Sequence, residues 1–146
     1  MRRILISLFF LLFASGILNA QLPVVEKGKP VGRIVLSTND AVDIKAAGLL
    51  QDFIRRISNA KLPIVHDTNT RKSDIIIGNG DLNKDIITKD ITEDGFRISV
   101  SKNNLHIVSG GGYGSVYAVV TLLERYLGVG YWGGEYEYSF TRPGQS

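Results

Sequence analysis

The sequence predicts an α/β fold of the α+β kind, in which two helices pack on one face of a single mixed sheet. Residues 46–57 and 116–127 place apolar side chains three and four positions apart, the spacing of an amphipathic helix that buries one side. Short runs of β-branched residues, bounded by Gly, Asn, Asp and Ser, precede the first helix and lie between the first and second helices, where they predict strands. Helices with one apolar side need a shared core to cover, which favours a layered domain.

The first half of the predicted domain is a strand, a helix and a second strand. Residues 33–37 (RIVLS) have the composition of a buried strand, and residues 38–40 (TND) offer side-chain oxygens that can cap the first turn of a helix. Residues 62–65 begin the next strand, where Pro63 marks a beginning or an edge. The buried side of the helix is predicted to hold Ala46, Leu49, Leu50, Phe53, Ile54 and Ile57.

The second half is a buried strand, a hairpin and the second helix. Residues 74–78 (DIIIG) resemble a strand covered on both faces, whereas residues 81–94 are polar and match no element. Alternation over 96–100 and 105–109 predicts a hairpin, on whose return strand His106 is expected to face solvent. The second helix is predicted to end at Gly128 and to bury Val116, Val119, Val120, Leu123 and Leu127.

Residues 1–20 are predicted to be a secretory signal peptide. Arg2 and Arg3 form a basic start, residues 4–13 are almost wholly apolar, and Ala20 closes an acceptable cleavage site. The apolar run is shorter than the ~20 residues that a membrane span needs. We therefore expect a secreted or periplasmic protein that makes no membrane contact after cleavage.

The remaining chain is predicted to be one domain, with residues 21–32 as a lead-in, 33–135 as the α/β domain and 136–146 as a tail. The formal charge of +3 falls to +1 when Arg2 and Arg3 are removed, so the sequence does not indicate a nucleic-acid partner. There is no cysteine, so an apolar core rather than disulfides must hold the fold. The sequence does not indicate an oligomeric state.

The glycine run at residues 110–114 admits two interpretations. A glycine-rich turn before a helix could cradle a nucleotide phosphate, but the third glycine of a dinucleotide fingerprint is Tyr117 here, and no Lys-Ser/Thr pair follows. The alternative is a tight strand-to-helix corner that needs positive φ and close backbone approach. The corner is the favoured interpretation.

No set of residues predicts a catalytic, cofactor or metal site. Residues 81–85 open like a calcium loop, but Ile86 stands where the sharp turn needs glycine. The two histidines lie far apart in the sequence, without a cysteine nearby. Glu135 and Glu137 would face the same way in an extended segment, yet nothing in the sequence encloses them in a cleft.

Several segments together carry a family resemblance: 46–65 (AAGLLQDFIRRISNAKLPIV), 74–78 (DIIIG), 94–100 (DGFRISV), 105–110 (LHIVSG), 114–124 (GSVYAVVTLLE) and 126–132 (YLGVGYW). In this order they resemble the non-catalytic N-terminal α/β domain of glycoside hydrolases such as alpha-glucuronidases and beta-hexosaminidases. The resemblance covers residues 33–135. One position departs from it, because Tyr113 stands where the family has an arginine.

The resemblance implies an accessory role. In the resembled enzymes this domain precedes a (β/α)₈ barrel that holds the catalytic carboxylates, and such a barrel takes ~250 residues. Only residues 133–146 follow Trp132, so we expect an accessory domain without turnover of its own. Its expected partner is a catalytic barrel domain or a carbohydrate.

Four aromatic residues among glycines are the candidate contact residues: Tyr131, Trp132, Tyr136 and Tyr138. Such rings can stack on the C–H face of a sugar, which would make the chain a stand-alone oligosaccharide-binding protein. They can equally pack against a neighbouring domain, since conspicuous surface aromatics mark interaction sites. Interface packing is the favoured hypothesis.

Overall fold

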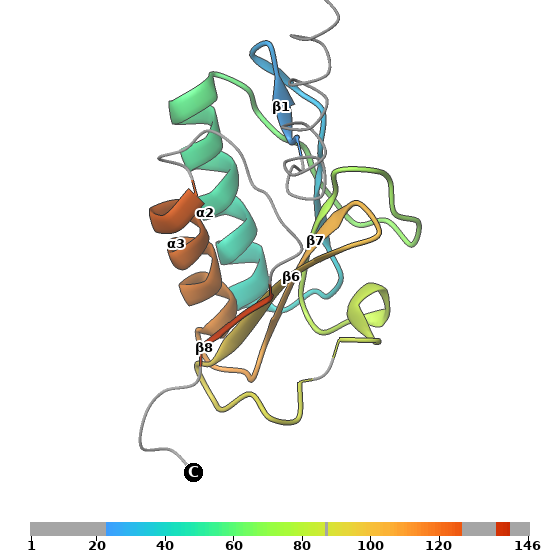
Figure 1. The fold of residues 1–146 in the computed structure, drawn as a ribbon, viewed down its shortest axis with the longest axis vertical. Coiled ribbons are helices and arrows are strands. Elements are labelled where there is room, and N and C mark those ends of the chain that lie inside the picture. The colour runs from blue at the N-terminus through green and yellow to red at the C-terminus, as the bar shows by residue number, and fades with distance from the viewer. Residues whose placement is uncertain (1–22, 87, 127–136, 141–146) are drawn as a thin grey trace, which may run out of the picture.

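The computed structural model describes residues 23–86, 88–126 and 137–140 (Figure 1). The predicted signal peptide lies outside the described residues. In chain order the elements are β1 (Val25–Glu26), β2 (Lys29–Pro30), β3 (Ile34–Leu36), α2 (Ala41–Ser58), β4 (Ile64–Val65), β5 (Ile75–Ile77), the 3₁₀ helix η1 (Asp81–Asn83), β6 (Phe96–Ser101), β7 (Asn104–Ser109), α3 (Gly114–Tyr126) and β8 (Glu137–Phe140). No helix in the described ranges has the length and apolar character needed to cross a membrane.

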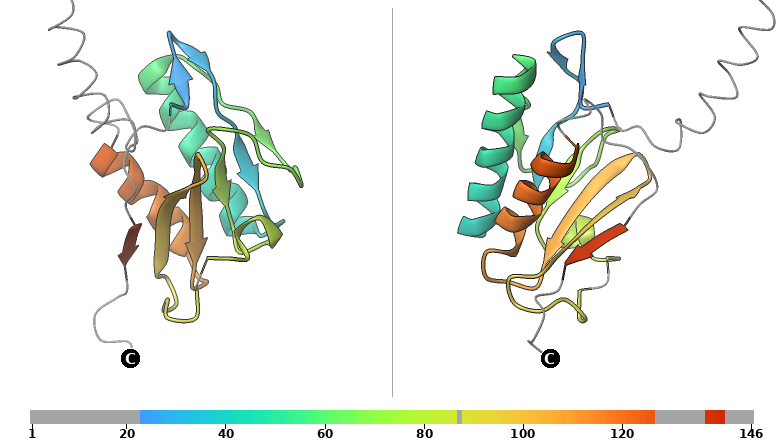
Figure 2. Two further views of the ribbon diagram at one scale, coloured as in Figure 1. Left: turned by 45° about the vertical axis from the view of Figure 1, so that its right-hand side comes forward. Right: turned by 60° about the vertical axis from the view of Figure 1, so that its left-hand side comes forward.

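The main sheet has six strands in the order β4-β3-β5-β7-β6-β8. The four strands from β4 to β7 are parallel, and β6 runs antiparallel to both β7 and β8. Both long helices lie on the same face of this sheet, as Figure 2 shows. The predicted class, a mixed sheet with two helices on one face, is confirmed. A separate hairpin of β1 and β2 precedes the sheet.

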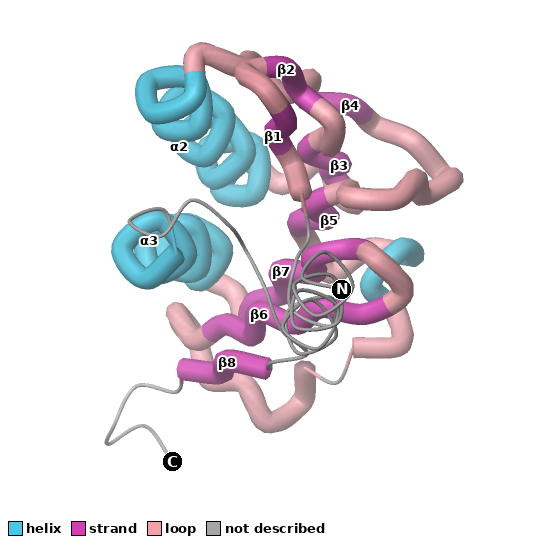
Figure 3. The backbone as a smooth tube through the Cα atoms, turned by 45° about the horizontal axis from the view of Figure 1, so that its top comes forward, coloured by secondary structure: helices cyan, strands magenta, loops and turns pink. Residues whose placement is uncertain are grey.

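The second face of the sheet is covered by the segment that the sequence pattern left without an element. Residues 79–86 leave β5 and form η1, residues 88–95 lead into β6, and Figure 3 places η1 on the side opposite the two helices. Ile75, Ile76 and Ile77 of β5 are therefore all buried, because both faces of their strand are covered. The core on the helix side is a single apolar cluster.

Helix α2 begins as predicted. The Asp40 carboxylate accepts hydrogen bonds from the backbone N–H groups of Val42 (2.8 Å) and Asp43 (3.2 Å), which satisfies donors of the first turn. The helix ends at Asn59, which adopts a left-handed backbone with φ of 61°.

Three predicted core positions are wrong. Phe53 and Ile57 of α2 are 39% and 58% exposed, and Val120 of α3 is 38% exposed. The buried residues of α2 are Asp43, Ala46, Ala47, Leu50 and Ile54, so Phe53 lies at the edge of the buried side, and Ile57 lies in the last turn, after the last buried residue of the helix. On α3, Ala118 and Leu122 are buried instead.

Residues 137–140, expected to belong to a tail, form the edge strand β8. It pairs with β6, with Tyr138 opposite Ile98 and Phe140 opposite Phe96. The pairing adds a sixth strand to the end of the sheet farthest from β4.

Candidate functional site

The candidate site lies where the parallel strands end. Because β3, β4, β5 and β7 are parallel, their carboxyl ends meet at one edge of the sheet. The chain leaves β3 toward α2 on one face and leaves the adjacent β5 toward η1 on the other (Figure 3). Adjacent strands whose connections diverge in this way leave a crevice between their ends, and α/β proteins commonly bind ligands there.

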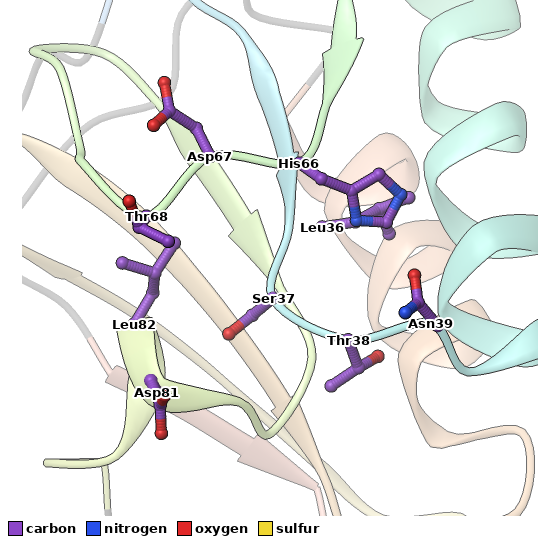
Figure 4. Close-up of a pocket in the computed structure, with 9 residues that line it drawn as sticks. All are labelled: Leu36, Ser37, Thr38, Asn39, His66, Asp67, Thr68, Asp81 and Leu82. Carbon is purple, nitrogen blue, oxygen red and sulfur yellow. The ribbon is translucent and has the colours of Figure 1, made fainter.

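The larger of two cavities at this edge has a volume of about 450 Å³, within the range of small-molecule sites. Figure 4 shows His66 and Asn39 on the side nearest α2 and Thr68 and Leu82 across from them. The lining comes from the segments after β3 and β4 and from η1: Leu36, Ser37, Thr38, Asn39, His66, Asp67, Thr68, Asp81 and Leu82.

A smaller cavity of about 220 Å³ adjoins the first at Thr38. It lies between the start of α2 and the residues that follow β5 and β7, and it is lined by Thr38, Asp40, Asp43, Asn79, Ser109, Gly111 and Gly112. We call the two cavities together the carboxyl-edge crevice. Sequence reasoning did not predict it, although residues 38–40 were recognised as helix-capping residues.

The carboxylates around the smaller cavity are bonded to groups of this chain. Asp40 caps α2, and the buried Asp43 carboxylate accepts a hydrogen bond of 2.5 Å from the Thr38 hydroxyl. Asp94 accepts the backbone N–H of Tyr113 at 2.7 Å, immediately before α3 begins. The N-termini of both helices thus already face carboxylates, which the helix dipole stabilises there.

The glycine run has the geometry of a corner. Gly111 and Gly112 have φ of 114° and 52°, values that a side chain disfavours. The Asp94 carboxylate stands against Gly112 and takes the Tyr113 N–H that a bound phosphate would need. Glycine serves here to let the 91–95 segment and the start of α3 approach each other closely.

Gly110 offers a test of that close approach. A Cβ at this position would collide with the backbone carbonyl oxygens of Ile91 and Thr92, whereas a Cβ at Gly48 in α2 would meet nothing within 4 Å. We expect Gly110→Ala to lower the free energy of unfolding by about 1–3 kcal/mol, and Gly48→Ala to raise it by about 0.5–1 kcal/mol. Urea titrations followed by circular dichroism measure both. A neutral Gly110→Ala variant would contradict the close approach.

Arginine 33 holds two carboxylates near the larger cavity. Its guanidinium donates to both oxygens of the fully buried Asp74 (2.9 and 2.7 Å) and to Asp67 (2.9 Å). The hydrogen bond from Arg33 is the main reason that the pKa of Asp67 is lowered. Asp67 lines the cavity, but its carboxylate is paired with the Arg33 guanidinium.

Two other carboxyl groups also have a pKa that is lowered by a hydrogen bond from an arginine. The pKa of Asp52 is lowered mainly by the hydrogen bond from Arg55, and that of Asp90 mainly by the hydrogen bond from Arg97. These shifts favour the charged form. A general acid for glycoside hydrolysis needs the opposite shift.

His106 is buried, so the expectation that it faces solvent is wrong. It is 8% exposed, and its ring nitrogens lie 2.8 Å from Asn83 Oδ1 and 3.1 Å from the Ser101 hydroxyl. The cause is the 79–95 segment, which covers this face of the sheet. The run of three isoleucines in β5 was the available signal, since a neighbouring strand of a twice-covered strand tends to be covered too.

Asn83, part of the calcium-like sequence at 81–85, is turned into the protein. Its amide nitrogen donates to the carbonyl oxygen of Gly78 at 2.8 Å, and its amide oxygen faces His106. Asn83 is 2% exposed, so its side chain joins η1 to the sheet rather than facing solvent as a cation ligand would.

The candidate contact residues from the sequence are untested. Tyr131, Trp132 and Tyr136 lie outside the described residues. Tyr138 belongs to β8, where its backbone pairs opposite Ile98. Their role in sugar stacking or interface packing stays a prediction.

No protein-family model and no curated protein matches the sequence. Solved structures with a similar fold were found. A family GH115 4-O-methyl-alpha-glucuronidase with specificity for decorated arabinogalactans has a TM-score of 0.56 and 20% identity, over 79% of this chain. A mutant beta-hexosaminidase from Streptomyces plicatus, in complex with N-acetylglucosamine, has a TM-score of 0.55 and 12% identity, over 84% of this chain. The chain shares its fold with a part of two glycoside hydrolases.

The shared part is a small fraction of each glycoside hydrolase. The match covers 18% of the alpha-glucuronidase chain and 24% of the beta-hexosaminidase chain. At these identities the likeness concerns the fold. It supports the fold relationship that the sequence motifs predicted.

Proposed function

We propose that this chain is an accessory domain of a secreted, carbohydrate-active, glycoside-hydrolase-like protein and that it performs no turnover itself. The observation that carries the proposal is the pair of fold matches, in which about four-fifths of this chain corresponds to less than a quarter of each glycoside hydrolase. Secretion is proposed from the signal-peptide pattern of residues 1–20.

The chemistry of the crevice supports a non-catalytic role. Glycosidases that use two carboxyl groups place them on either side of the scissile bond, and one must hold a proton near neutral pH. Here Asp40 and Asp94 cap helices and Asp43 accepts from Thr38. Each would have to give up a structural hydrogen bond to act on a substrate.

The outer face of α3 supports an interaction role. Tyr113 and Tyr117 are 53% and 42% exposed, and Val120 continues the same stripe at the next helical position. The two rings lie 6.4 Å apart, and the Lys45 ammonium lies 5.8 Å from the Tyr113 ring centre. Exposed tyrosines beside an apolar residue are typical of interface surfaces, and the partner we propose is a catalytic domain.

A turnover assay tests the proposal. We expect the purified chain to release no nitrophenol from chromogenic glucuronides and N-acetylhexosaminides above the rate in buffer. A variant that carries Asp43→Asn serves as the matched control, because a contaminating hydrolase would act equally in both preparations. Turnover that the substitution abolishes in a folded protein would overturn the accessory role.

A further inference from the structure

We propose that the carboxyl-edge crevice binds a neutral saccharide, a ligand rich in hydroxyl groups and without charge. The inference rests on the proposed function for the choice of carbohydrate, but the site and the charge preference come from the crevice itself. The described residues around it supply unengaged polar groups, apolar patches and an excess of negative charge, and each constrains the ligand.

Three polar side chains at the wall of the larger cavity are free to form hydrogen bonds with a ligand. The side chains of Asn39, His66 and Thr68 are exposed at its wall and make no hydrogen bond to the part of the chain that the structure describes. Ser37 also belongs to the lining, but its hydroxyl is covered from solvent, where Gly80 packs against it, and has no partner among the described residues.

The cavity also carries apolar surface between these groups. Leu36 lies at its back and Leu82 on the side of η1 (Figure 4). A pyranose ring presents C–H groups on one face and hydroxyl groups around its edge. The cavity combines leucine side chains with Ser, Thr, Asn and His side chains. This combination suits the C–H groups and hydroxyl groups of a pyranose better than it suits a purely ionic ligand.

The charges around the crevice disfavour an anion. The Asp40 carboxylate takes first-turn N–H groups of α2, and the Asp94 carboxylate takes the Tyr113 N–H just before α3, so both positions already hold a negative charge that would repel a bound anion. Asp43 and Asp81 add negative charge at the two cavities. Arg33 does not offset this charge for a ligand, because it is already bonded to Asp67 and Asp74.

The decisive experiment compares neutral sugars with a sugar that carries a carboxylate. The ¹⁵N-labelled chain is titrated with the methyl glycosides of galactose, arabinose and N-acetylglucosamine, and with methyl galacturonide, which differs from the galactoside only by a carboxylate at C6. We expect at least one neutral glycoside to shift the amide resonances of residues 37–39, 66–68 and 81–82. The galacturonide should bind about tenfold more weakly than the galactoside, and added salt should narrow the difference.

Variants locate the site. Thr68→Ala and His66→Ala should each weaken binding of the neutral glycoside at least fivefold, because both side chains are exposed at the cavity wall. Thr121→Ala is the matched control, since it removes the same hydroxyl from the half-buried side of α3 and should leave affinity unchanged. The ¹H–¹⁵N spectrum of each variant shows that it is folded.

Three outcomes would overturn the proposal: no shift at the crevice amides with any neutral glycoside, binding of the galacturonide as tight as that of the galactoside, or shifts confined to residues 131–138. The last would place binding at the aromatic segment instead. Turnover of chromogenic glycosides would overturn the accessory role whatever the titration shows. Absence of both turnover and crevice shifts would overturn the saccharide site alone.

Discussion

Replacing Arg33 with alanine is expected to lower the free energy of unfolding by about 3–5 kcal/mol. The Asp74 carboxylate is fully buried and has Arg33 as its charged partner, with two hydrogen bonds of 2.9 and 2.7 Å. Removing the guanidinium leaves a charge in the interior that the backbone N–H of Arg71, at 2.7 Å, only partly satisfies. The penalty is the desolvation of an unpaired charge.

The matched control is Arg55→Ala. Arg55 pairs with Asp52 at 3.0 Å, but its side chain is 50% exposed, so water replaces the partner and the expected loss is at most about 1 kcal/mol. Guanidinium chloride titrations of both variants give the comparison. Equal losses in the two variants would show that burial of Asp74 does not govern the effect. Arg33→Lys should fall between them, since lysine keeps the charge but not the paired donors.

Stability is expected to fall as the pH drops below about 6.5, because His106 is buried in its neutral form. Burial is the main cause that lowers the pKa of His106, and the nearby Lys102 charge acts in the same direction. The unfolded chain, in which histidine has its ordinary pKa, therefore binds more protons than the folded chain in this range. The free energy of unfolding then decreases with decreasing pH, by up to about 1.4 kcal/mol per pH unit, until the folded-state pKa is reached.

The hydrogen-bond network identifies the neutral form. Asn83 donates its amide N–H to Gly78, so its amide oxygen must accept from His106 Nδ1–H. His106 Nε2 is then left to accept from the Ser101 hydroxyl. Protonation would add a charge to a ring that has no carboxylate among these partners.

Urea titrations at pH 7.5 and 5.5 measure this effect. The carboxyl groups with a lowered pKa, those of Asp52, Asp67 and Asp90, stay charged at both pH values and contribute little to the difference. His106→Gln is the control: it keeps polar atoms near Asn83 and should remove most of the difference between the two pH values, even if it lowers stability at both. A wild-type stability that is the same at pH 7.5 and 5.5 would contradict the burial of a neutral histidine.

The features that the sequence predicted correctly depend on local patterns. The helical spacing in residues 46–57 and the oxygen-bearing residues before it located α2 and its cap at Asp40. Alternation and turn residues located the β6–β7 hairpin, and three isoleucines indicated a twice-covered β5. The order of these motifs also predicted the fold relationship with glycoside hydrolases.

Local patterns could not predict where the buried side of a helix ends. Ile57 has the correct spacing for the core but lies in the last turn of α2, after Ile54, the last buried residue of the helix. His106 has the alternation of an outward residue, but the irregular segment 79–95 covers it. The exposure of Ile57 and the burial of His106 both depend on which other segments pack against each element. The spacing of residues along one element does not contain that information.

By itself, the sequence determined the class of the fold, the two helices, the hairpin and the corner at the glycine run, because periodicity, capping and turn residues act over a few positions. Only the tertiary structure decided that the segments after β3, β4, β5 and β7 meet in a carboxyl-edge crevice. The physical reason is that the meeting depends on the strand order β4-β3-β5-β7, in which β5 joins the side of β3 opposite to β4. That order is set by burial of all the strands and helices together.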